Sequence, residues 1–333
     1  MEHLWRRSIS RRRTLAIFAG AATALVTRRS RAAEPPRLFE WRGTALGAEA
    51  TIRLYAHTAA QATEALDAAA AEIERLENEF SLYRPSSTLC RLNRDGHLLN
   101  PSLDMRFLLA EAVRFGQLTR GAFDVTVQPL WEIYATHFSR HPHDRSGPPR
   151  ELLARTVRLV DYRRIGIQPD RITLPSGMAI TLNGIAQGYI TDRVADLLRA
   201  RGWHNVLVDL GELRGVGAHP NGRPWTAALP SSLDAAHGAA MVPLTEWAIA
   251  TSSGATTRFE PTGRYHHLFS PASGRSAATY ATVTVAAPRA TLADALSTTL
   301  FVAPSSATEH ILSQVPGAQA WLWFADGSAK HLG

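Results

Sequence analysis

The sequence predicts an α+β fold in which mixed, largely antiparallel sheets pack against helices. Segments with strand and helix patterns are interleaved along the chain, and hairpin-like strand pairs are prominent among them. The 333 residues are 45% hydrophobic, which is enough to bury a large core. Beyond residue 40 we find no repeat of fixed period and no convincing linker. We therefore expect residues 34–333 to form one domain.

The first half of the chain contains two strong helix patterns. Residues 34–42 are typical of a short linker, and residues 49–55 alternate as a strand does. Residues 58–79 are alanine-rich, with apolar side chains at helical spacing, and predict an amphipathic helix. Residues 102–118 predict a second helix for the same reason. The proline-rich segment 141–149 is expected to be a loop.

The second half alternates between strands and helices. Residues 171–174 and 179–182 predict a hairpin, because Pro-Ser-Gly lies between them. A helix is expected over 186–201, closed by Gly202, and a buried strand over 205–210. The remaining expected elements are strands at 224–229, 246–251, 281–287 and 318–324, and helices at 291–302 and 306–314.

The N-terminus has the layout of an export signal. Residues 10–15 resemble the twin-arginine consensus, and residues 15–26 are apolar or small, too few for a bilayer span of about 20 residues. An uncleaved basic anchor is the alternative. Arg28 and Arg29 after the apolar stretch fit the twin-arginine route better. We expect residues 1–33 to be a twin-arginine signal peptide, with a periplasmic protein and no stable membrane insertion after its removal.

The formal charge of +7 comes from the same segment. Residues 1–33 hold eight of the 36 basic residues and one of the 29 acidic residues, which leaves 28 of each sign elsewhere. Those charges are spread out, so we expect no nucleic-acid partner, because phosphate binding needs concentrated positive charge. Cys90 is the only cysteine, so no disulfide can form within the chain and no cysteine near the signal is available for lipid attachment.

The segment Ala-Asp-Ala-Leu-Ser-Thr contains a candidate cation site. On a helix, Asp294 and Thr298 lie four residues apart and share a face. A carboxylate beside a hydroxyl suits a hard cation such as Mg²⁺, which takes oxygen ligands and keeps waters that phosphate oxygens can replace. Taken alone, the pattern is weak and favours an acidic residue on a solvated helix face.

Residues 181–189, Thr-Leu-Asn-Gly-Ile-Ala-Gln-Gly-Tyr, lead from a strand through a glycine-bearing turn into a helix. Backbone N–H groups at such a helix start are free to face an anion, and Gly184 and Gly188 allow close backbone approach. The spacing differs from that of a Rossmann glycine motif. An ordinary strand–turn–helix corner is the alternative.

Two further segments carry residue types suited to binding or catalysis. His266 and His267 are adjacent on an expected strand, so they point to opposite faces and at most one enters a given site. That one is a candidate general base, and a surface histidine beside a turn is the alternative. In residues 121–126, Phe123 beside Asp124 is suited to gripping a flavin or adenine, or equally to plugging the core with a capping aspartate.

Together, in this order and spacing, these segments resemble the ApbE family of FAD:protein FMN transferases. The similarity runs over nearly all of residues 40–325 and includes residues 43–47 (Gly-Thr-Ala-Leu-Gly), 80–85 (Phe-Ser-Leu-Tyr-Arg-Pro) and 250–252 (Ala-Thr-Ser). The resemblance implies an ApbE-like, T-fold-like core. It also implies Mg²⁺-dependent transfer of FMN from FAD to a threonine hydroxyl of another protein, with release of AMP.

The resemblance also implies site residues. The metal ligands would be Asp294, Thr298 and the backbone carbonyl of Gly184, with Asp294 also counted as catalytic. His267 matches the histidine of the family's H-x-x-D-P segment and is the candidate base. The FAD contacts would be Leu46, Tyr83, Ala122, Phe123, Asp124, Thr181, Gln187 and Leu268. The partner would be an exported or membrane redox flavoprotein carrying an S/T-G-A-T type motif.

The chain departs from the family pattern at three of these positions. Thr181 stands where the family usually has an acid, Gln187 where it has a lysine, and Ser270 where Asp-Pro is typical. The losses at 181 and 187 remove one charge of each sign, so they are able to compensate each other. These departures motivate the alternative of an FAD-binding accessory protein without transferase activity.

Overall fold

The large sheet is the centre of the fold. The computed structural model describes residues 34–229 and 240–333, so the signal peptide predicted at 1–33 lies outside them. Eight strands form one sheet in the order β1-β2-β6-β7-β10-β11-β12-β13, and every neighbouring pair is antiparallel. The strands are β1 (Arg37–Ala45), β2 (Ala48–Ala56), β6 (Asn205–Asp209), β7 (Leu213–Gly217), β10 (Ala248–Ser253), β11 (Tyr280–Ala287), β12 (Gln319–Phe324) and β13 (Ala329–Leu332).

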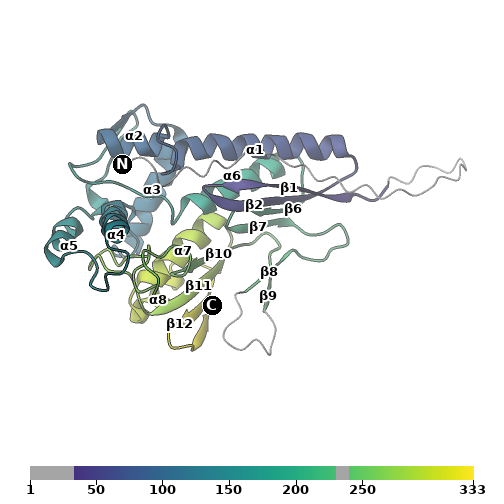
Figure 1. The fold of residues 1–333 in the computed structure, drawn as a ribbon. Helices are drawn as coiled ribbons and strands as arrows, with labels where there is room; N and C mark the ends of the chain where they lie inside the picture. Colours follow the sequence, from purple (N-terminus) through teal and green to yellow (C-terminus); the bar gives the residue numbers. More distant parts are fainter. Residues whose placement is uncertain (1–33, 230–239) are drawn as a thin grey trace, which may run out of the picture.

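Helices pack beside this sheet, as Figure 1 shows, so the predicted α+β class is confirmed. The α-helices are α1 (Ala59–Phe80), α2 (Thr88–Asp95), α3 (Leu103–Leu118), α4 (Gln128–Arg140), α5 (Arg150–Val157), α6 (Ala186–Ala200), α7 (Ala290–Val302) and α8 (Thr308–Ser313), with short 3-10 turns η1 (Val125–Val127), η2 (Tyr162–Arg164) and η4 (Ser305–Ala307). Two small sheets are β3-β5-β4 (His97–Leu99, Arg171–Thr173, Gly166–Ile167) and β8-β9 (Thr226–Ala228, Met241–Pro243).

The two faces of the large sheet have separate cores, because side chains alternate along a strand. Val206 and Val208 face the helices and belong to the main core, which draws on residues from Trp41 to Leu322. Leu207, between them, belongs to a smaller core on the other face, where Trp225 and Leu244 from around the β8-β9 hairpin pack. The helix-covered face carries the candidate site.

Helix α1 begins and ends as its sequence predicts. The Thr58 side chain accepts a hydrogen bond from the Gln61 N–H and so caps the helix. One side of the helix, including Leu66, Ile73 and Leu76, is buried in the main core. Among the residues that the structure describes, no helix is both long and apolar enough to cross a bilayer.

Two expectations about strands are wrong. Residues 37–45 are not a linker but strand β1, which pairs with β2 along its whole length. Residues 179–182 form no hairpin with β5, which pairs instead with β3 and β4. The reason is that Asn93 occupies both backbone groups of Ile180, accepting from its N–H and donating to its carbonyl, each at 2.8 Å.

Most of the expected elements are confirmed within a few residues. The helices predicted at 58–79, 102–118, 186–201 and 291–302 correspond to α1, α3, α6 and α7. The helix expected at 306–314 is shorter, because residues 305–307 form a 3-10 turn before α8. The strand expected at 224–229 is reduced to β8.

Candidate functional site

Helices α6 and α7 meet at the start of α6. The Asp294 Oδ2 atom on α7 accepts a hydrogen bond of 2.9 Å from the Gly188 N–H. A Cβ on Gly188 would lie 2.6 Å from the Ala290 carbonyl carbon and 2.8 Å from the Asp294 Cβ, so only glycine permits this approach. The predicted close approach at Gly188 is therefore present, and it brings the Asp294 carboxylate to the start of α6.

The backbone N–H groups at this helix start are largely occupied, which differs from the expectation that they are free. The N–H groups of Ile185 and Ala186 donate to the Leu182 carbonyl, and that of Gly188 donates to Asp294. The anion that the start of α6 meets is therefore the carboxylate of Asp294. A negative charge is favoured there by the helix dipole.

The turn before α6 lies against Thr298, one of the predicted metal ligands. A Cβ on Gly184 would lie 3.1 Å from Thr298 Oγ1, so the backbone of the turn before α6 passes against this hydroxyl. Ser252 Oγ at the end of β10 lies 3.3 Å from Thr298 Oγ1 and 2.8 Å from Ser297 Oγ. The hydroxyl oxygens of Ser252, Ser297 and Thr298 therefore gather where α7 meets β10, beside the Gly184 backbone and one helical turn from Asp294. This donor set fits a hard divalent cation.

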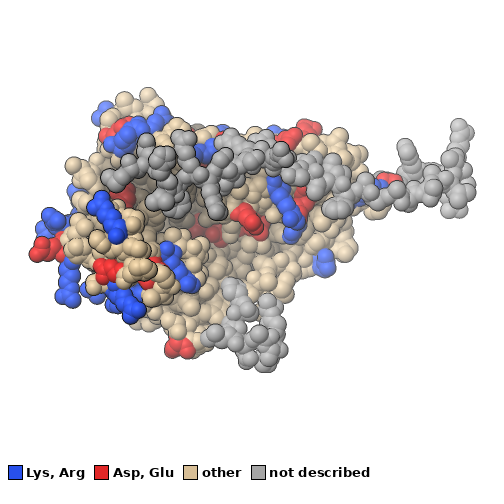
Figure 2. All heavy atoms as spheres, viewed as in Figure 1, with Lys and Arg blue, Asp and Glu red and all other residues tan. Residues whose placement is uncertain are grey.

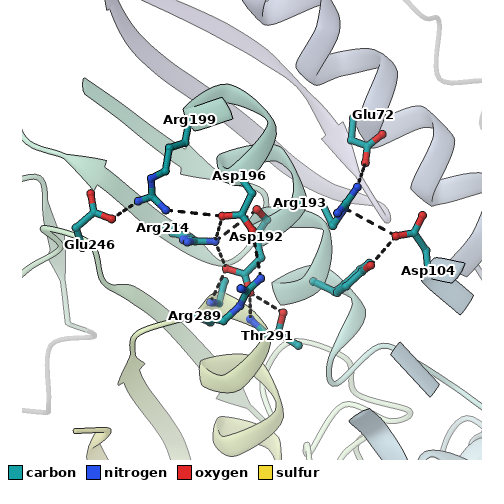
Figure 3. Close-up of polar contacts among 12 residues, drawn as sticks. Glu72, Asp104, Asp192, Arg193, Asp196, Arg199, Arg214, Glu246, Arg289 and Thr291 are labelled. Carbon is teal, nitrogen blue, oxygen red and sulfur yellow. Dashed lines mark hydrogen bonds and ion pairs between the residues drawn. The ribbon is translucent and has the colours of Figure 1, made fainter. Parts of the chain in front are cut away.

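The start of α7 is fixed by Asp192 on α6, as Figure 3 shows. Its carboxylate is fully buried and accepts hydrogen bonds from the Ala290 N–H, the Thr291 N–H and the Thr291 hydroxyl, at 3.0, 3.0 and 2.6 Å. Arg214 and Arg289 form ion pairs with it at 2.6 and 3.2 Å. Because Asp192 caps α7, it sets the position from which Asp294 projects.

Two buried carboxyl groups at this site have raised pKa values. Burial is the main cause for Asp294, whose pKa rises to about 7 although the Gly188 N–H opposes the shift. Burial also raises the pKa of Glu212 well above its usual value, and the negative charge of Asp294 adds to the shift. In the part of the chain that the structure describes, no three His, Cys, Asp or Glu side chains are grouped so as to hold a metal ion. A cation here would depend on hydroxyl and carbonyl oxygens as well.

The Ala122–Phe123–Asp124 segment has a structural role and also borders the site. Phe123 is buried, and its ring lies 3.4 Å from a Cβ placed on Gly184. Asp124 accepts hydrogen bonds from the Thr126 N–H and the Tyr162 N–H at 2.8 and 3.0 Å. Of the two expectations for this segment, the core plug with a capping aspartate describes these contacts.

A cavity of about 490 Å³ opens beside the same segment. Its walls include Gly121 and Asp124, the arginines Arg120 and Arg163, and residues 271–272. Its volume lies in the range of small-molecule sites. Ala122 and Phe123 therefore lie between this cavity and Gly184, beside the gathered oxygen donors.

Leu46 and Tyr83 lie near each other at the end of α1. Leu46, in the turn between β1 and β2, has a φ of 47° and donates its N–H to Glu77 Oε1 at 2.7 Å. Glu77 also pairs with Arg84, the residue after Tyr83. The Tyr83 side chain is 68% exposed, which leaves its ring free to stack on a planar ligand.

Gln187, in the first turn of α6, contacts the segment that follows strand β6. Its Nε2 donates to the Leu210 carbonyl at 3.2 Å. A Cβ on Gly211 would lie 3.1 Å from the Gln187 amide carbon and 3.7 Å from the Ala48 Cβ, so the β1–β2 turn, residue 211 and the start of α6 lie side by side. Gln187 is therefore held by a backbone carbonyl.

Thr181 and Leu268 occupy backbone-bonded positions. The Thr181 N–H donates to the Val125 carbonyl at 2.8 Å, and its hydroxyl accepts from the Asn183 N–H at 3.3 Å. Leu268 is buried in the main core, and its N–H donates to His266 Nδ1 at 3.2 Å. Thr181 thus lies beside the segment that contains Asp124.

The two histidines lie in a loop with one isolated bridge at His266, so the expected strand is wrong. His266 is buried, and its Nε2–H donates to the Ala277 carbonyl at 2.8 Å. His267 is half-buried, and its Nδ1 lies 3.2 Å from the Thr257 carbonyl, which leaves Nε2 as a proton acceptor. Burial lowers the His267 pKa to about 4, so the ring is neutral at pH 7. The described contacts join His267 to Thr257 and not to Asp294 or Thr298.

The sequence interpretation did not assign two residues at this site. Ser252 contacts the Thr298 hydroxyl, and Glu212 interacts electrostatically with Asp294. The signal for Glu212 was its place after a strand and a glycine turn, where acidic residues often face a ligand. Ser252 belongs to the Ala-Thr-Ser segment of the family resemblance, but its contact with Thr298 depends on how β10 lies against α7.

Comparison with known proteins identifies the family. The model of the ApbE family matches residues 46–322. FAD:protein FMN transferases from Haemophilus influenzae and Vibrio cholerae are 30% and 32% identical to this chain, over 67% and 69% of it and 68% and 70% of their own lengths.

Solved structures agree with this result. The flavin transferase ApbE from Vibrio cholerae gives a TM-score of 0.76 at 26% identity, covering 89% of this chain and 97% of that one. The ApbE protein from Thermotoga maritima gives 0.77 at 25% identity, with the same coverage. This chain belongs to the ApbE family.

Proposed function

We propose that this protein is an FAD:protein FMN transferase that moves FMN from FAD onto a threonine hydroxyl of another protein, with Mg²⁺ as cofactor and AMP as the second product. The family and the names of its relatives support flavin transfer. The observation that supports the finer proposal is the packing of the start of α6 on α7, where Asp294 contacts the Gly188 N–H and Thr298 lies against the Gly184 backbone.

Asp294, Thr298 and the Gly184 carbonyl would hold the cation. Asp294 is already directed to the start of α6, and the Asp192 cap fixes the helix that carries it. When bound, Mg²⁺ would offset the negative charge of the FAD pyrophosphate. Such a site uses few protein ligands and leaves positions for phosphate oxygens, as magnesium sites usually do.

The bond changes are those of a phosphoryl-group displacement. The acceptor threonine oxygen forms a bond to the phosphorus of the FMN half, and the bond from that phosphorus to the oxygen shared with AMP breaks. The hydroxyl proton passes to His267 Nε2, and AMP leaves with the bridging oxygen. The neutral imidazole has a free lone pair for this proton, and general-base catalysis contributes roughly 10²–10⁴ in rate. For His267 Nε2 to reach the acceptor hydroxyl, binding of the acceptor or a movement of the loop around His267 would have to bring these two groups together.

FAD would lie along the surface between the β1–β2 turn and the cavity beside Asp124. Leu46, Tyr83 and Gln187 would contact one end, and Ala122, Phe123, Asp124, Thr181 and Leu268 the other. The exposed Tyr83 ring is the natural stacking partner for a flat ring system. The acceptor would be an exported or membrane redox flavoprotein with an S/T-G-A-T type motif, and the transferase itself would act in the periplasm after twin-arginine export.

One assay tests this proposal. The protein lacking residues 1–33 is incubated with FAD, Mg²⁺ and an acceptor that carries the motif, and the acceptor is then analysed by intact mass and in-gel flavin fluorescence. Covalent FMN on a threonine together with AMP release supports the proposal. Tight FAD binding without transfer would favour the accessory protein that the changes at Thr181 and Gln187 motivate.

A further inference from the structure

Glu212 is a buried acidic side chain to which the proposed transfer reaction assigns no role. It lies between Gly211 and strand β7 and is 7% exposed. Its Oε2 atom is buried and has no hydrogen-bond partner among the described residues. A carboxylate removed from water without a partner is costly, so such an atom in a folded protein indicates a missing ligand.

The surroundings of Glu212 are acidic. Asp294 and Asp209 are the charged groups that act on it, and both disfavour its ionised form, while the Thr251 N–H is the group that favours it. The nearest arginine in sequence, Arg214, is already paired with Asp192 and Asp196 at 2.6 and 3.0 Å. In the described part of the chain, no basic side chain forms an ion pair with Glu212.

The backbone of Glu212 is fixed against the same elements that hold Asp294. Its carbonyl accepts a hydrogen bond of 3.3 Å from the Thr191 hydroxyl, one helical turn beyond Gln187 on α6. Strand β7 pairs with β10 through Ala248 and Ile249, and Ser252, near the end of β10, contacts Thr298. Glu212 is therefore anchored between α6 and β10, beside the gathered oxygen donors.

We propose that Glu212 is a further residue of the divalent-cation site, supplying its free Oε2 beside Asp294. The inference rests on the proposed Mg²⁺ dependence and extends it by naming a second carboxylate. Two carboxylates give the site a charge of about −2, which a divalent cation neutralises, and magnesium sites in proteins commonly use one or two carboxylates. A monovalent cation would leave one buried negative charge uncompensated.

The test is a Mn²⁺ titration of Glu212→Gln, with free Mn²⁺ followed by its electron paramagnetic resonance signal. The exchange keeps the shape of the side chain and removes its charge. The control is Glu260→Gln, a glutamate of similar burial whose oxygens accept bonds from the Thr262 N–H, the Thr262 hydroxyl and the Tyr265 N–H. We expect Glu212→Gln to weaken Mn²⁺ binding about 10- to 100-fold, the usual effect of removing a group that supports a metal site. Glu260→Gln should bind Mn²⁺ as the unmodified protein does.

Thermal unfolding with a chelator separates a ligand from a purely structural residue. Without a cation, Glu212→Gln should unfold at a temperature no lower than the unmodified protein, because it replaces a buried acid whose ionisation burial and Asp294 disfavour with a neutral amide of the same shape. An unchanged Mn²⁺ affinity in the variant, with or without a lower unfolding temperature, would overturn the inference. If Glu212→Gln does not fold, Glu212→Ala is measured in the same way and judged by the same affinity criterion.

The control arms distinguish this inference from the proposed function. If the unmodified protein and Glu260→Gln bind no Mn²⁺, with or without FAD present, the cation site itself is wrong and the inference falls with it. If both bind Mn²⁺ and Glu212→Gln binds equally well, only the role of Glu212 is wrong.

Discussion

Gly188→Ala tests the close packing of α6 on α7. A new methyl group would lie 2.6 Å from the Ala290 carbonyl carbon and 2.8 Å from the Asp294 Cβ, both inside ordinary contact distances by roughly 1 Å. Both neighbours are backbone or backbone-near atoms of a buried helix, so the helices must separate. Overpacking of this kind costs about 1–3 kcal/mol, and the better helix propensity of alanine recovers at most about 1 kcal/mol.

The same shift lengthens the 2.9 Å bond from the Gly188 N–H to Asp294, so cation binding should weaken together with stability. Thermal unfolding measures the first effect, and one kcal/mol corresponds to roughly 2 °C for a chain of this size. Gly184→Ala is the comparison variant, because its methyl group would lie 3.1 Å from the flexible Thr298 side chain and should cost less stability. A Gly188→Ala protein with unchanged unfolding temperature and Mn²⁺ affinity would refute the packing argument.

Three further predictions concern the groups around this contact. Asp192→Asn should lower the free energy of unfolding by about 3 kcal/mol, measured in urea titrations. The reason is that the variant removes the charge that pairs with the buried Arg214 and weakens the cap of α7. A loss under about 1 kcal/mol would contradict this. Without a divalent cation, Asp294 has a folded pKa of about 7 against 3.8 when unfolded, so its contribution destabilises the folded state as pH rises from about 4 to 7. Cation binding opposes this and should strengthen over the same range; calorimetric Mn²⁺ affinities independent of pH would be inconsistent with a buried Asp294 ligand. His267→Asn should slow transfer by roughly 10²–10⁴ while FAD affinity, followed by flavin fluorescence, stays the same, and a rate within threefold of the unmodified protein would remove His267 as the base.

The sequence predicted the elements whose apolar residues recur at a regular period. Helix α1 is buried along one clear helical stripe, so periodicity was enough to find it. Strand β1 was missed because its charged Arg37, Glu40 and Arg42 mask the alternation. That strand is defined by its pairing with β2 at the edge of the sheet, which no local pattern reports.

In the candidate site too, some residues were predictable from a local pattern and others depended on tertiary packing. Asp294 and Thr298 were predictable as neighbours because they lie one turn apart on a single helix. The approach of Gly184 to Thr298 depends on how α6 packs on α7, and only the family resemblance indicated it. Glu212 reaches the site from the turn between β6 and β7 and Ser252 from β10, so their positions required the structure.

The most direct test compares the unmodified protein with Asp294→Asn in the transfer assay, using the intact mass of the acceptor as the measurement. Circular dichroism first establishes that both proteins are folded. With FAD and Mg²⁺, we predict one covalent FMN on the acceptor for the unmodified protein and none for Asp294→Asn. Equal flavin attachment by the two proteins would contradict a transfer that depends on a cation held by Asp294.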